Sequence, residues 1–320
     1  MTKNKNISSG KWAALSTIAA AFVTSIALLI AGCTIDRRDP NDPDVLLSFS
    51  PAMYMQVDGE LLGGYPDDRP FSVWAWVNDA PVVPASTWKY IENSKVVHIS
   101  GDLWTPDGNV YWPSRDKRMT VIASAPYGRA SSCSLSEGVT FSDVDMTSES
   151  ADLLYSTPQT SLDKMEDGGK VPMPFNHALC QIAFRVKNRA DAPNNGQIRL
   201  RRLTIDGLLT RGTFHSLPEP SWTLAGEPSP LTFFEGDFIT RNVSDPVGVS
   251  RLAIPQDLDT FVTVEYDLCT PSGTTTHTST SGPLQTALQS GRRYIYTLSI
   301  GLDDIRFISE LIEHDFTTEN

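Results

Sequence analysis

One cysteine, Cys33, stands where the sequence could carry a covalent lipid. The first eleven residues contain three lysines, residues 13–29 are almost all apolar or small, and residues 30–33 read Ile-Ala-Gly-Cys. This order is that of a lipoprotein signal, in which a peptidase cuts before the cysteine and its sulfur receives diacylglycerol. A transmembrane helix over residues 12–32 is the alternative, because that stretch is long enough to span a bilayer. We favour lipidation of Cys33, since a membrane helix does not need small residues followed by cysteine and a polar tether.

The remaining chemical side chains do not form a recognisable catalytic set. His177 and Cys180 are the only close His/Cys pair, and a spacing of three in a strand sends them to opposite faces. The sequence contains no HExxH motif, no Gly-x-Ser-x-Gly elbow and no phosphate-binding loop. We therefore expect no enzyme, no metal site and no cofactor. A β-sandwich hydrolase stays open as a weaker alternative, because carboxylates distant in sequence can meet in space.

The tryptophans suggest either packing or sugar binding. Trp74 and Trp76 lie in a run whose two faces are both apolar, so another layer must cover one face. Trp88, Trp104 and Trp112 lie beside polar turns, where an exposed ring could stack on a sugar. Packing in a core or between domains is the interpretation we favour for these rings.

The charge and the cysteines limit the class of partner. Removing residues 1–32 takes away three lysines and no acidic residue, so the net charge of −12 becomes −15. Such an acidic chain is a poor ligand for nucleic acid or for an anionic membrane. Once Cys33 carries a lipid, Cys133, Cys180 and Cys269 remain, and because three is odd at least one thiol stays free or pairs between chains. The alternation of Cys180 with Ile182, Phe184 and Val186 predicts a small buried side chain.

Short runs with a period of two predict antiparallel β structure from residue 45 onward. Turn residues separate the runs, and the only helical windows are short, such as Asp152–Tyr155. The fold class we expect is all-β, built from sandwiches. The faces that alternate are 45/47/49, 71/73/75/77, 119/121/123/125, 262/264/266/268 and 294/296/298/300.

Composition divides the chain into four parts. Residues 1–32 are the signal peptide, and residues 33–44 form an acidic, proline-broken tether. Polar residues replace the apolar alternation over residues 157–170. We therefore expect an N-terminal β-sandwich domain over residues 45–165 and a C-terminal β-sandwich domain over residues 166–320.

Six separated stretches form a recognisable series along the chain. They are FSVWAW (71–76), YWP (111–113), TVIASAPY (120–127), FNHALCQIAFRV (175–186), LAIPQ (252–256) and GRRYIYTL (291–298). No single stretch is specific, but the six follow one another behind a lipoprotein signal. Together they resemble the fimbrillin-like proteins of Bacteroidales, in content and in order.

The resemblance implies two tandem transthyretin-like (Greek-key) β-sandwiches in a lipoprotein of the outer membrane and cell surface. It also implies a subunit of type V pili, which assemble when a strand of one subunit fills a groove in the next. The strand candidates are Val45, Leu47 and Phe49 at the start of the fold, and the C-terminal tail at its end. In that tail Ile305, Phe307 and Leu311 are expected on one face and Ile308 and Ile312 on the other. The tail could equally complete its own sandwich.

One departure from the family concerns proteolysis. Polymerising members are cut after an arginine beyond the first strand. Here Arg37 and Arg38 precede that strand, the next arginine, Arg69, is followed by Pro70, and no other arginine occurs before Arg115. The sequence therefore favours an anchor, tip or minor component of a fimbria, serving adhesion, over a bulk stalk subunit. The alternative function is a surface glycan-binding lipoprotein; a host or bacterial receptor or glycan is a further expected partner, and nucleic acid is not.

Overall fold

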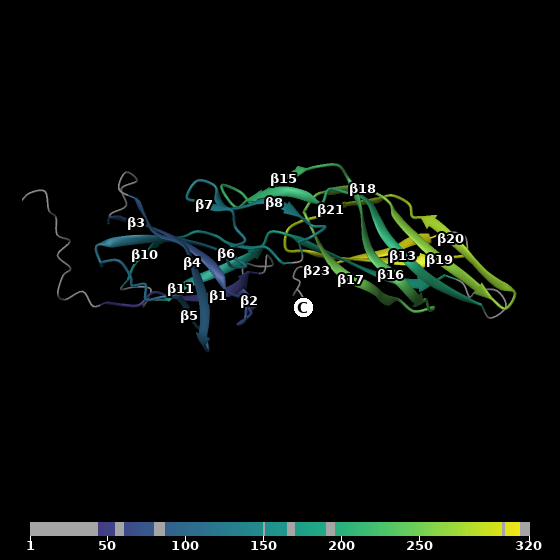
Figure 1. Ribbon diagram of the computed structural model, residues 1–320, viewed down its shortest axis with the longest axis horizontal. Coiled ribbons are helices and arrows are strands. Elements are labelled where there is room, and N and C mark those ends of the chain that lie inside the picture. The colour runs from purple at the N-terminus through teal and green to yellow at the C-terminus, as the bar shows by residue number, and fades with distance from the viewer. Residues whose placement is uncertain are drawn as a thin grey trace, which may run out of the picture. The chain divides into compact units, whose positions relative to one another are not determined.

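The described chain is entirely β structure (Figure 1). A computed structural model describes residues 44–54, 61–79, 87–149, 151–164, 170–189, 196–302 and 305–313. These residues form 23 strands and no helix, which confirms the predicted fold class. The short helical window at Asp152–Tyr155 forms no helix, because residues 154–156 form strand β9 instead. The buried side chains of Leu154 and Tyr155 are held there by pairing with β11 and β6.

A nine-stranded sheet contains most of the strands before residue 178. Its path is β10-β6-β3-β4-β5-β1-β11-β9, with β2 paired to β1. The first and last strands along the sequence, β1 and β11, are parallel neighbours, whereas the other pairs are antiparallel. The strands are β1 (Ser48–Tyr54), β2 (Leu61–Gly64), β3 (Phe71–Asp79), β4 (Trp88–Ser100), β5 (Leu103–Pro106), β6 (Lys117–Ala125), β9 (Leu154–Ser156), β10 (Gln159–Leu162) and β11 (Lys170–His177).

Strand β3 is covered on both faces, as its sequence predicts. Phe71, Val73, Ala75 and Val77 pack in one core together with alternate residues of β1, β6 and β11. Trp74 and Trp76 point to the opposite face, where they join a second core with Phe141 and Phe214. A strand that is apolar on both faces is stable only between two layers. The two tryptophans are therefore packing residues.

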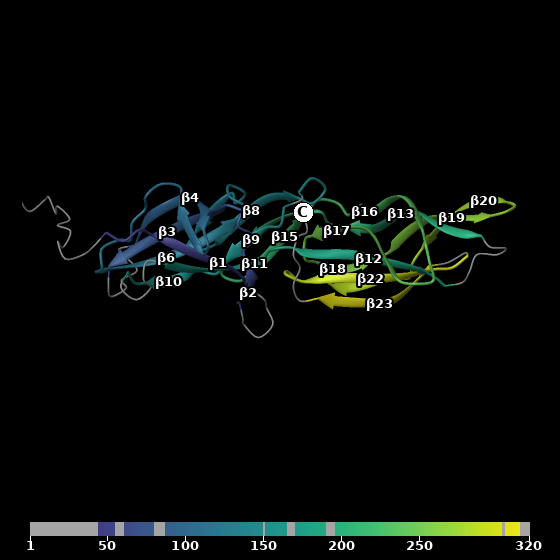
Figure 2. The ribbon, with the colours of Figure 1, turned by 90° about the horizontal axis from the view of Figure 1, so that it is seen from below.

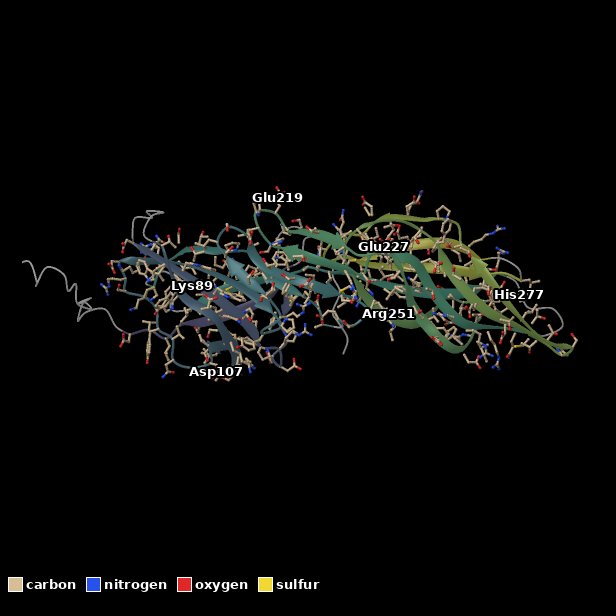
Figure 3. The ribbon with its side chains drawn as sticks, turned by 45° about the horizontal axis from the view of Figure 1, so that its top comes forward. Lys89, Asp107, Glu219, Glu227, Arg251 and His277 are labelled. Carbon is tan, nitrogen blue, oxygen red and sulfur yellow. The ribbon has the colours of Figure 1, made fainter. Side chains whose placement is uncertain are left out.

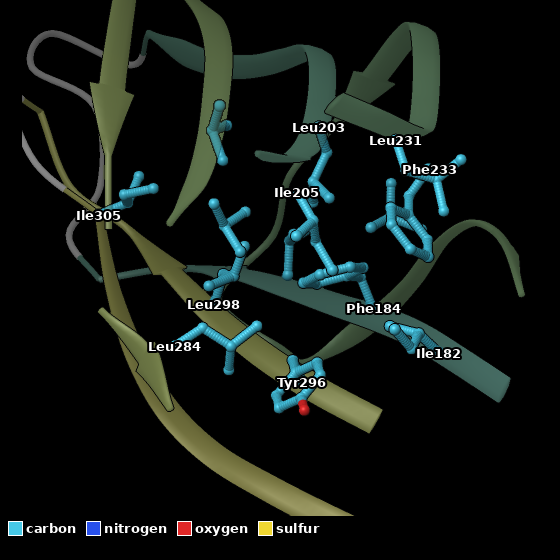
Figure 4. Packing of buried hydrophobic residues seen from close by; sticks show 14 of the residues in the cluster. Ile182, Phe184, Leu203, Ile205, Leu231, Phe233, Leu284, Tyr296, Leu298 and Ile305 are labelled. Carbon is cyan, nitrogen blue, oxygen red and sulfur yellow. The ribbon is translucent and has the colours of Figure 1, made fainter. Parts of the chain in front are cut away.

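Two four-stranded sheets enclose the core of the C-terminal half (Figures 1 and 2). One has the order β17-β12-β22-β23 and the other β16-β13-β19-β20. Phe184, Tyr296 and Leu298 of the first sheet meet Leu203, Ile205 and Phe233 of the second within a single hydrophobic cluster (Figure 4). The strands are β12 (Cys180–Asn188), β13 (Gln197–Leu208), β16 (Ser229–Ile239), β17 (Asp245–Ala253), β19 (Val262–Thr270), β20 (Gly273–Thr280), β22 (Arg293–Ile300) and β23 (Ile305–Glu313).

Two smaller sheets complete the described structure. The sheet β15-β14-β8-β7 supplies the second core with Phe141 and Phe214, whose rings stack with centroids 5.9 Å apart. The pair β18-β21 contributes Leu258 and Leu284 to the C-terminal core. The strands are β7 (Ser132–Ser134), β8 (Gly138–Asp145), β14 (Arg211–His215), β15 (Ser221–Ala225), β18 (Asp257–Thr260) and β21 (Leu284–Ala287).

The residues from Asp44 to Asn320 form one compact unit. The predicted signal peptide, Cys33 and the tether up to residue 43 lie outside the described residues. Within the described part of the chain, no helix is long and apolar enough to cross a membrane. The domain boundary at residues 165 and 166 stays a prediction, and the strand that follows it, β11, pairs with β1 and β9.

Candidate functional site

Strand β1 lies inside the N-terminal sheet and not at its edge. It runs parallel to β11, with Ser48 opposite Lys170 and Met53 opposite Phe175. On its other side Phe49 faces Trp104 of β5, and residues further along face β2. An N-terminal strand therefore fills a slot between β5 and β11, which are distant from it in sequence.

The inward-pointing side chains of β1 and of the residues just before it lie in the N-terminal core. Leu47 and Phe49 are 1% and 0% exposed, and Val45 and Met53 pack at the margin of the same core. The ring of Phe49 meets Phe71 edge to face, with centroids 6.0 Å apart. Edge-to-face pairs of this kind add stabilisation beyond the burial of their area. The face formed by Val45, Leu47 and Phe49, predicted from alternation alone, is thus a core face.

The backbone just before β1 forms hydrogen bonds with residues 110–112. The Leu47 amide donates to the Val110 carbonyl over 2.8 Å, and the Trp112 amide donates to the Val45 carbonyl over 2.8 Å. Removal of residues 45–53 would therefore expose a row of amides and carbonyls on β11 and on residues 110–112. Unpaired strand edges of this kind are templates for another extended chain.

Strand β23 is the opposite case, because it lies at an edge. It pairs antiparallel with β22 alone (Figure 2). Ile305 is buried and Phe307 is half-buried against Tyr296, whereas Ile308 and Leu311 are 46% and 51% exposed. An exposed, partly apolar edge strand is a site where another chain can add. The two strands singled out from the sequence, β1 and β23, belong to different sheets and are not brought together.

The expected division of the tail into two faces is wrong at one point. Phe307 is opposite Leu298 and Ser309 is opposite Thr297, so the register shifts at Ile308. Ile305 and Phe307 face the core, but Leu311 lies opposite the outward-facing Ile295, and Ile312 lies opposite the inward-facing Tyr294. A bulge adds one residue to one strand and reverses the alternation after it. Alternation in the sequence does not predict such an insertion.

The sugar-stacking alternative loses two of its three rings. Trp104 and Trp112 are buried in the N-terminal core, next to Phe49 and Phe71. Only Trp88 is open, at 43% exposed, and the Lys117 ammonium lies 5.3 Å from its ring centroid. Both buried tryptophans precede a polar turn in the sequence. These polar neighbours suggested exposed rings, although the rings themselves are buried.

The histidine and cysteines considered for catalysis are buried. His177 and Asp152 are both buried, with Nδ1 and Oδ2 2.6 Å apart. Cys180 lies on a different strand, where its thiol donates to the Ala253 carbonyl and burial raises its pKa. Cys133 is also buried, and desolvation raises the pKa of its thiol to about 12. A neutral, enclosed thiol is a poor nucleophile.

No disulfide or metal cluster occurs among the residues that the structure describes. Cys133, Cys180 and Cys269 are all free thiols. The same residues contain no group of three or more His, Cys, Asp or Glu side chains that could hold a metal ion. Cys180 faces the core together with Ile182, Phe184 and Val186, as its alternation predicts.

A family model decides which proteins this chain is related to. The model described as fimbrillin-like matches residues 64–314, most of the chain. The chain belongs to the fimbrillin-like family. The match begins in β2 and ends just after β23, so it includes the strands that surround the β1 slot and the edge strand β23. No curated protein matches this fimbrillin-like chain.

Solved structures with the same fold come from species of Bacteroides. A fimbrial protein from Bacteroides vulgatus is 17% identical with a TM-score of 0.59, covering 83% of this chain and 99% of its own. A candidate cell adhesion protein from Bacteroides ovatus is 15% identical with a TM-score of 0.58, covering 87% and 100%. At these identities the likeness shows that the fimbrillin-like chain shares their fold.

Proposed function

We propose that this protein is a fimbrial subunit of the cell surface that assembles by exchange of a β-strand between copies. The single observation that carries the proposal is the position of β1, an N-terminal strand enclosed between β5 and β11. Membership of the fimbrillin-like family and the fimbrial protein of the same fold support it. The slot of β1 is the acceptor, and β23 of a second copy is the donor.

The side chains of the two strands match in spacing and in kind. Leu47, just before β1, and Phe49, Pro51 and Met53 within β1 recur at every second residue, and Ile305, Phe307, Ser309 and Leu311 do so along β23. In both series the order of side chains is the same: an unbranched or branched apolar chain, a phenylalanine, a small residue, and a second apolar chain. The match holds only when the donor has the same chain direction as β1, and therefore runs parallel to β11.

The exchange has a physical driving force. In its own subunit β23 has one neighbouring strand and leaves Leu311 half in water. In the slot it would have a strand on each side and would place Phe307 where Phe49 is fully buried. Burial of an aliphatic or aromatic side chain stabilises by about 1.5–3 kcal/mol. Loss of Ile305 from its own core opposes the exchange, so the gain comes from Phe307, Leu311 and the additional backbone hydrogen bonds.

The sequence around β1 bears on the place of the subunit in a fimbria. No arginine lies between β1 and Arg69, and Arg69 is followed by proline. A subunit that keeps β1 can donate a strand but cannot accept one, so it ends a polymer. Together with lipidation at Cys33, this favours an anchor, tip or minor component held at the outer membrane, serving adhesion.

The proposal is tested by emptying the slot in the unit from Asp44 to Asn320. A specific protease site placed at residues 55–60 allows β1 to be cut from β2, and mild denaturant then releases it. We expect the cut protein to form heat-labile, SDS-resistant oligomers and to bind a synthetic peptide of residues 303–313. A cut protein that stays monomeric and does not bind the peptide contradicts strand exchange.

Two peptide variants make the test specific for the register. Phe307→Glu places a charge where the slot holds Phe49, so binding should be lost. Ile312→Glu is the matched control, because residue 312 lies outside the four matched positions and is already 43% exposed. Equal loss with both peptides would contradict the register while leaving strand exchange itself intact.

A further inference from the structure

The outward face of the β17-β12-β22-β23 sheet is basic in an acidic protein. The pairing register shows which side chains of β12, β22 and β23 point away from the core. Among these outward-facing side chains are four cations and one acid. By contrast, residues 44–169 contain 18 acidic and 8 basic residues, a net charge of −10. The outward-facing charged residues are Arg185, Lys187, Arg293, Arg306 and Glu313.

Two of these cations have no opposite charge beside them in the described structure. Arg293 lies 3.6 Å from Glu313, but neither Arg185 nor Lys187 has an ion-pair partner among the described residues. An exposed cation without a partner is available to an acidic ligand. Their neighbours Phe184 and Val186 point into the core, and this alternation places both cations on one open face.

A groove of about 280 Å³ separates these cations from the edge strand. Arg185 and Lys187 line one side, and Ile308 and Leu311 of β23 line the other. Its lining includes Ile295, which is buried although it faces outward from the sheet. Cations beside aliphatic side chains suit a polypeptide surface that carries carboxylates next to apolar residues.

We propose that this groove and its basic rim are the encounter surface for the acidic N-terminal half of a second copy. The inference rests on the proposed function, because it joins the half that holds the acceptor slot to the face that borders the donor strand. Opposite charges on two surfaces raise the rate of productive encounter by about 10- to 1,000-fold. The contact is head to tail, so it repeats from copy to copy.

The acidic half presents carboxylates that fit this role. Asp67 and Asp107 are exposed beside β4, where Asp67 lies 3.7 Å from the His98 ring and the Asp107 amide binds the Lys95 carbonyl. Figure 3 shows Asp107 at the surface of this half. Both lie near the β4–β5 hairpin, and β5 is one wall of the slot.

The first test measures association while β1 is still in place, so that strand exchange does not contribute. Sedimentation of the Asp44–Asn320 unit should show weak self-association at about 20 mM salt that fades at about 300 mM, where screening is strong. The double variant R185E/K187E should stay monomeric at both. The control R202E/R211E changes the net charge equally at exposed arginines elsewhere and should associate as the wild type does.

A rescue experiment identifies the partner surface. The variant D67K/D107K should not associate with itself, but it should associate with R185E/K187E when the two are mixed. The proposal is overturned if R185E/K187E self-associates as strongly as the wild type. It is also overturned if an anionic polysaccharide binds through Arg185 and Lys187 while self-association does not depend on these two residues.

The second test uses the protein with its slot emptied. R185E/K187E should slow oligomer formation at least about tenfold and remove its salt dependence. Equal rates for the variant and the wild type overturn the encounter surface but leave strand exchange standing. If no cut protein forms oligomers, strand exchange fails, and the sedimentation result still decides the encounter surface.

Discussion

The rings of Phe49 and Phe71 meet edge to face with their centroids 6.0 Å apart. Phe49 belongs to the first strand, and Phe71 belongs to β3, so the contact joins β1 to the centre of the N-terminal core. Phe175 and Trp104 lie in the same core. Whatever occupies the slot must supply an aromatic ring at this position or leave a cavity.

Phe49→Ala should destabilise the Asp44–Asn320 unit by about 3–5 kcal/mol, because it removes a fully buried ring from a packed core. Urea unfolding followed by tryptophan fluorescence measures the change. Leu46→Ala is the matched control, since Leu46 is exposed in the same segment and should cost less than about 0.5 kcal/mol. A loss of equal size at both positions would show that β1 is not packed as described.

Gly248→Ala should destabilise by about 1–3 kcal/mol, because an alanine there is strained in two ways. Gly248 has φ +69°, and a Cβ added to it would overlap the Phe233 carbonyl oxygen. Gly282→Ala provides the control, since an added Cβ meets nothing within 4 Å. Thermal unfolding of both variants checks this close approach of β16 and β17.

Asp267 should make stability depend on pH in the acid range. Hydrogen bonds from Thr276 and then from Arg201 hold the pKa of its carboxyl below the ordinary 3.8. A lowered folded pKa stabilises the fold fully above the unfolded value, and the contribution is lost as pH falls through the folded value. Asp267→Asn should therefore lower the melting temperature at pH 6, and the difference should shrink below about pH 4. A difference that is constant down to pH 2 would contradict this role.

Only one of the three thiols of the Asp44–Asn320 unit should react in the native protein. Burial raises the pKa of Cys133 to about 12 and that of Cys180 as well, so both stay protonated and enclosed. Cys269 is half-exposed on β19. A thiol reagent at pH 8 should label about one equivalent quickly and the other two only after unfolding, and Cys269→Ser should remove the fast phase.

The all-β fold could be predicted because alternation is a local property of the chain. The period of two in residues 119–125 and 294–300 fixes which side chains share a face, and the inward faces of these two segments are buried. The double-sided burial of Trp74 and Trp76 follows from the same pattern. The helical window at residues 152–155 shows the limit of local patterns, because strand pairing with β6 and β11 overrode a weak local helical preference.

The candidate site depends on contacts between residues far apart in sequence. Alternation marks Leu47 and Phe49 as a buried face, but only tertiary pairing places them between β5 and β11. The bulge at Ile308 reverses the faces of the tail after Phe307, and the pairing with β22 decides where it falls. The sequence did not single out Arg185 and Lys187. Alternation indicates that they lie on the outward face of a strand, but it does not show which residues surround them on that face.

The sequence by itself determined which residues are apolar, at what spacing they recur, and where a lipid could be attached. The tertiary structure decided which strands are neighbours, which edge stays open, and that Trp104 and Trp112 lie in a core while Trp88 does not. The physical reason is that side-chain direction follows from the local backbone, whereas burial and pairing follow from what the rest of the chain brings to each face.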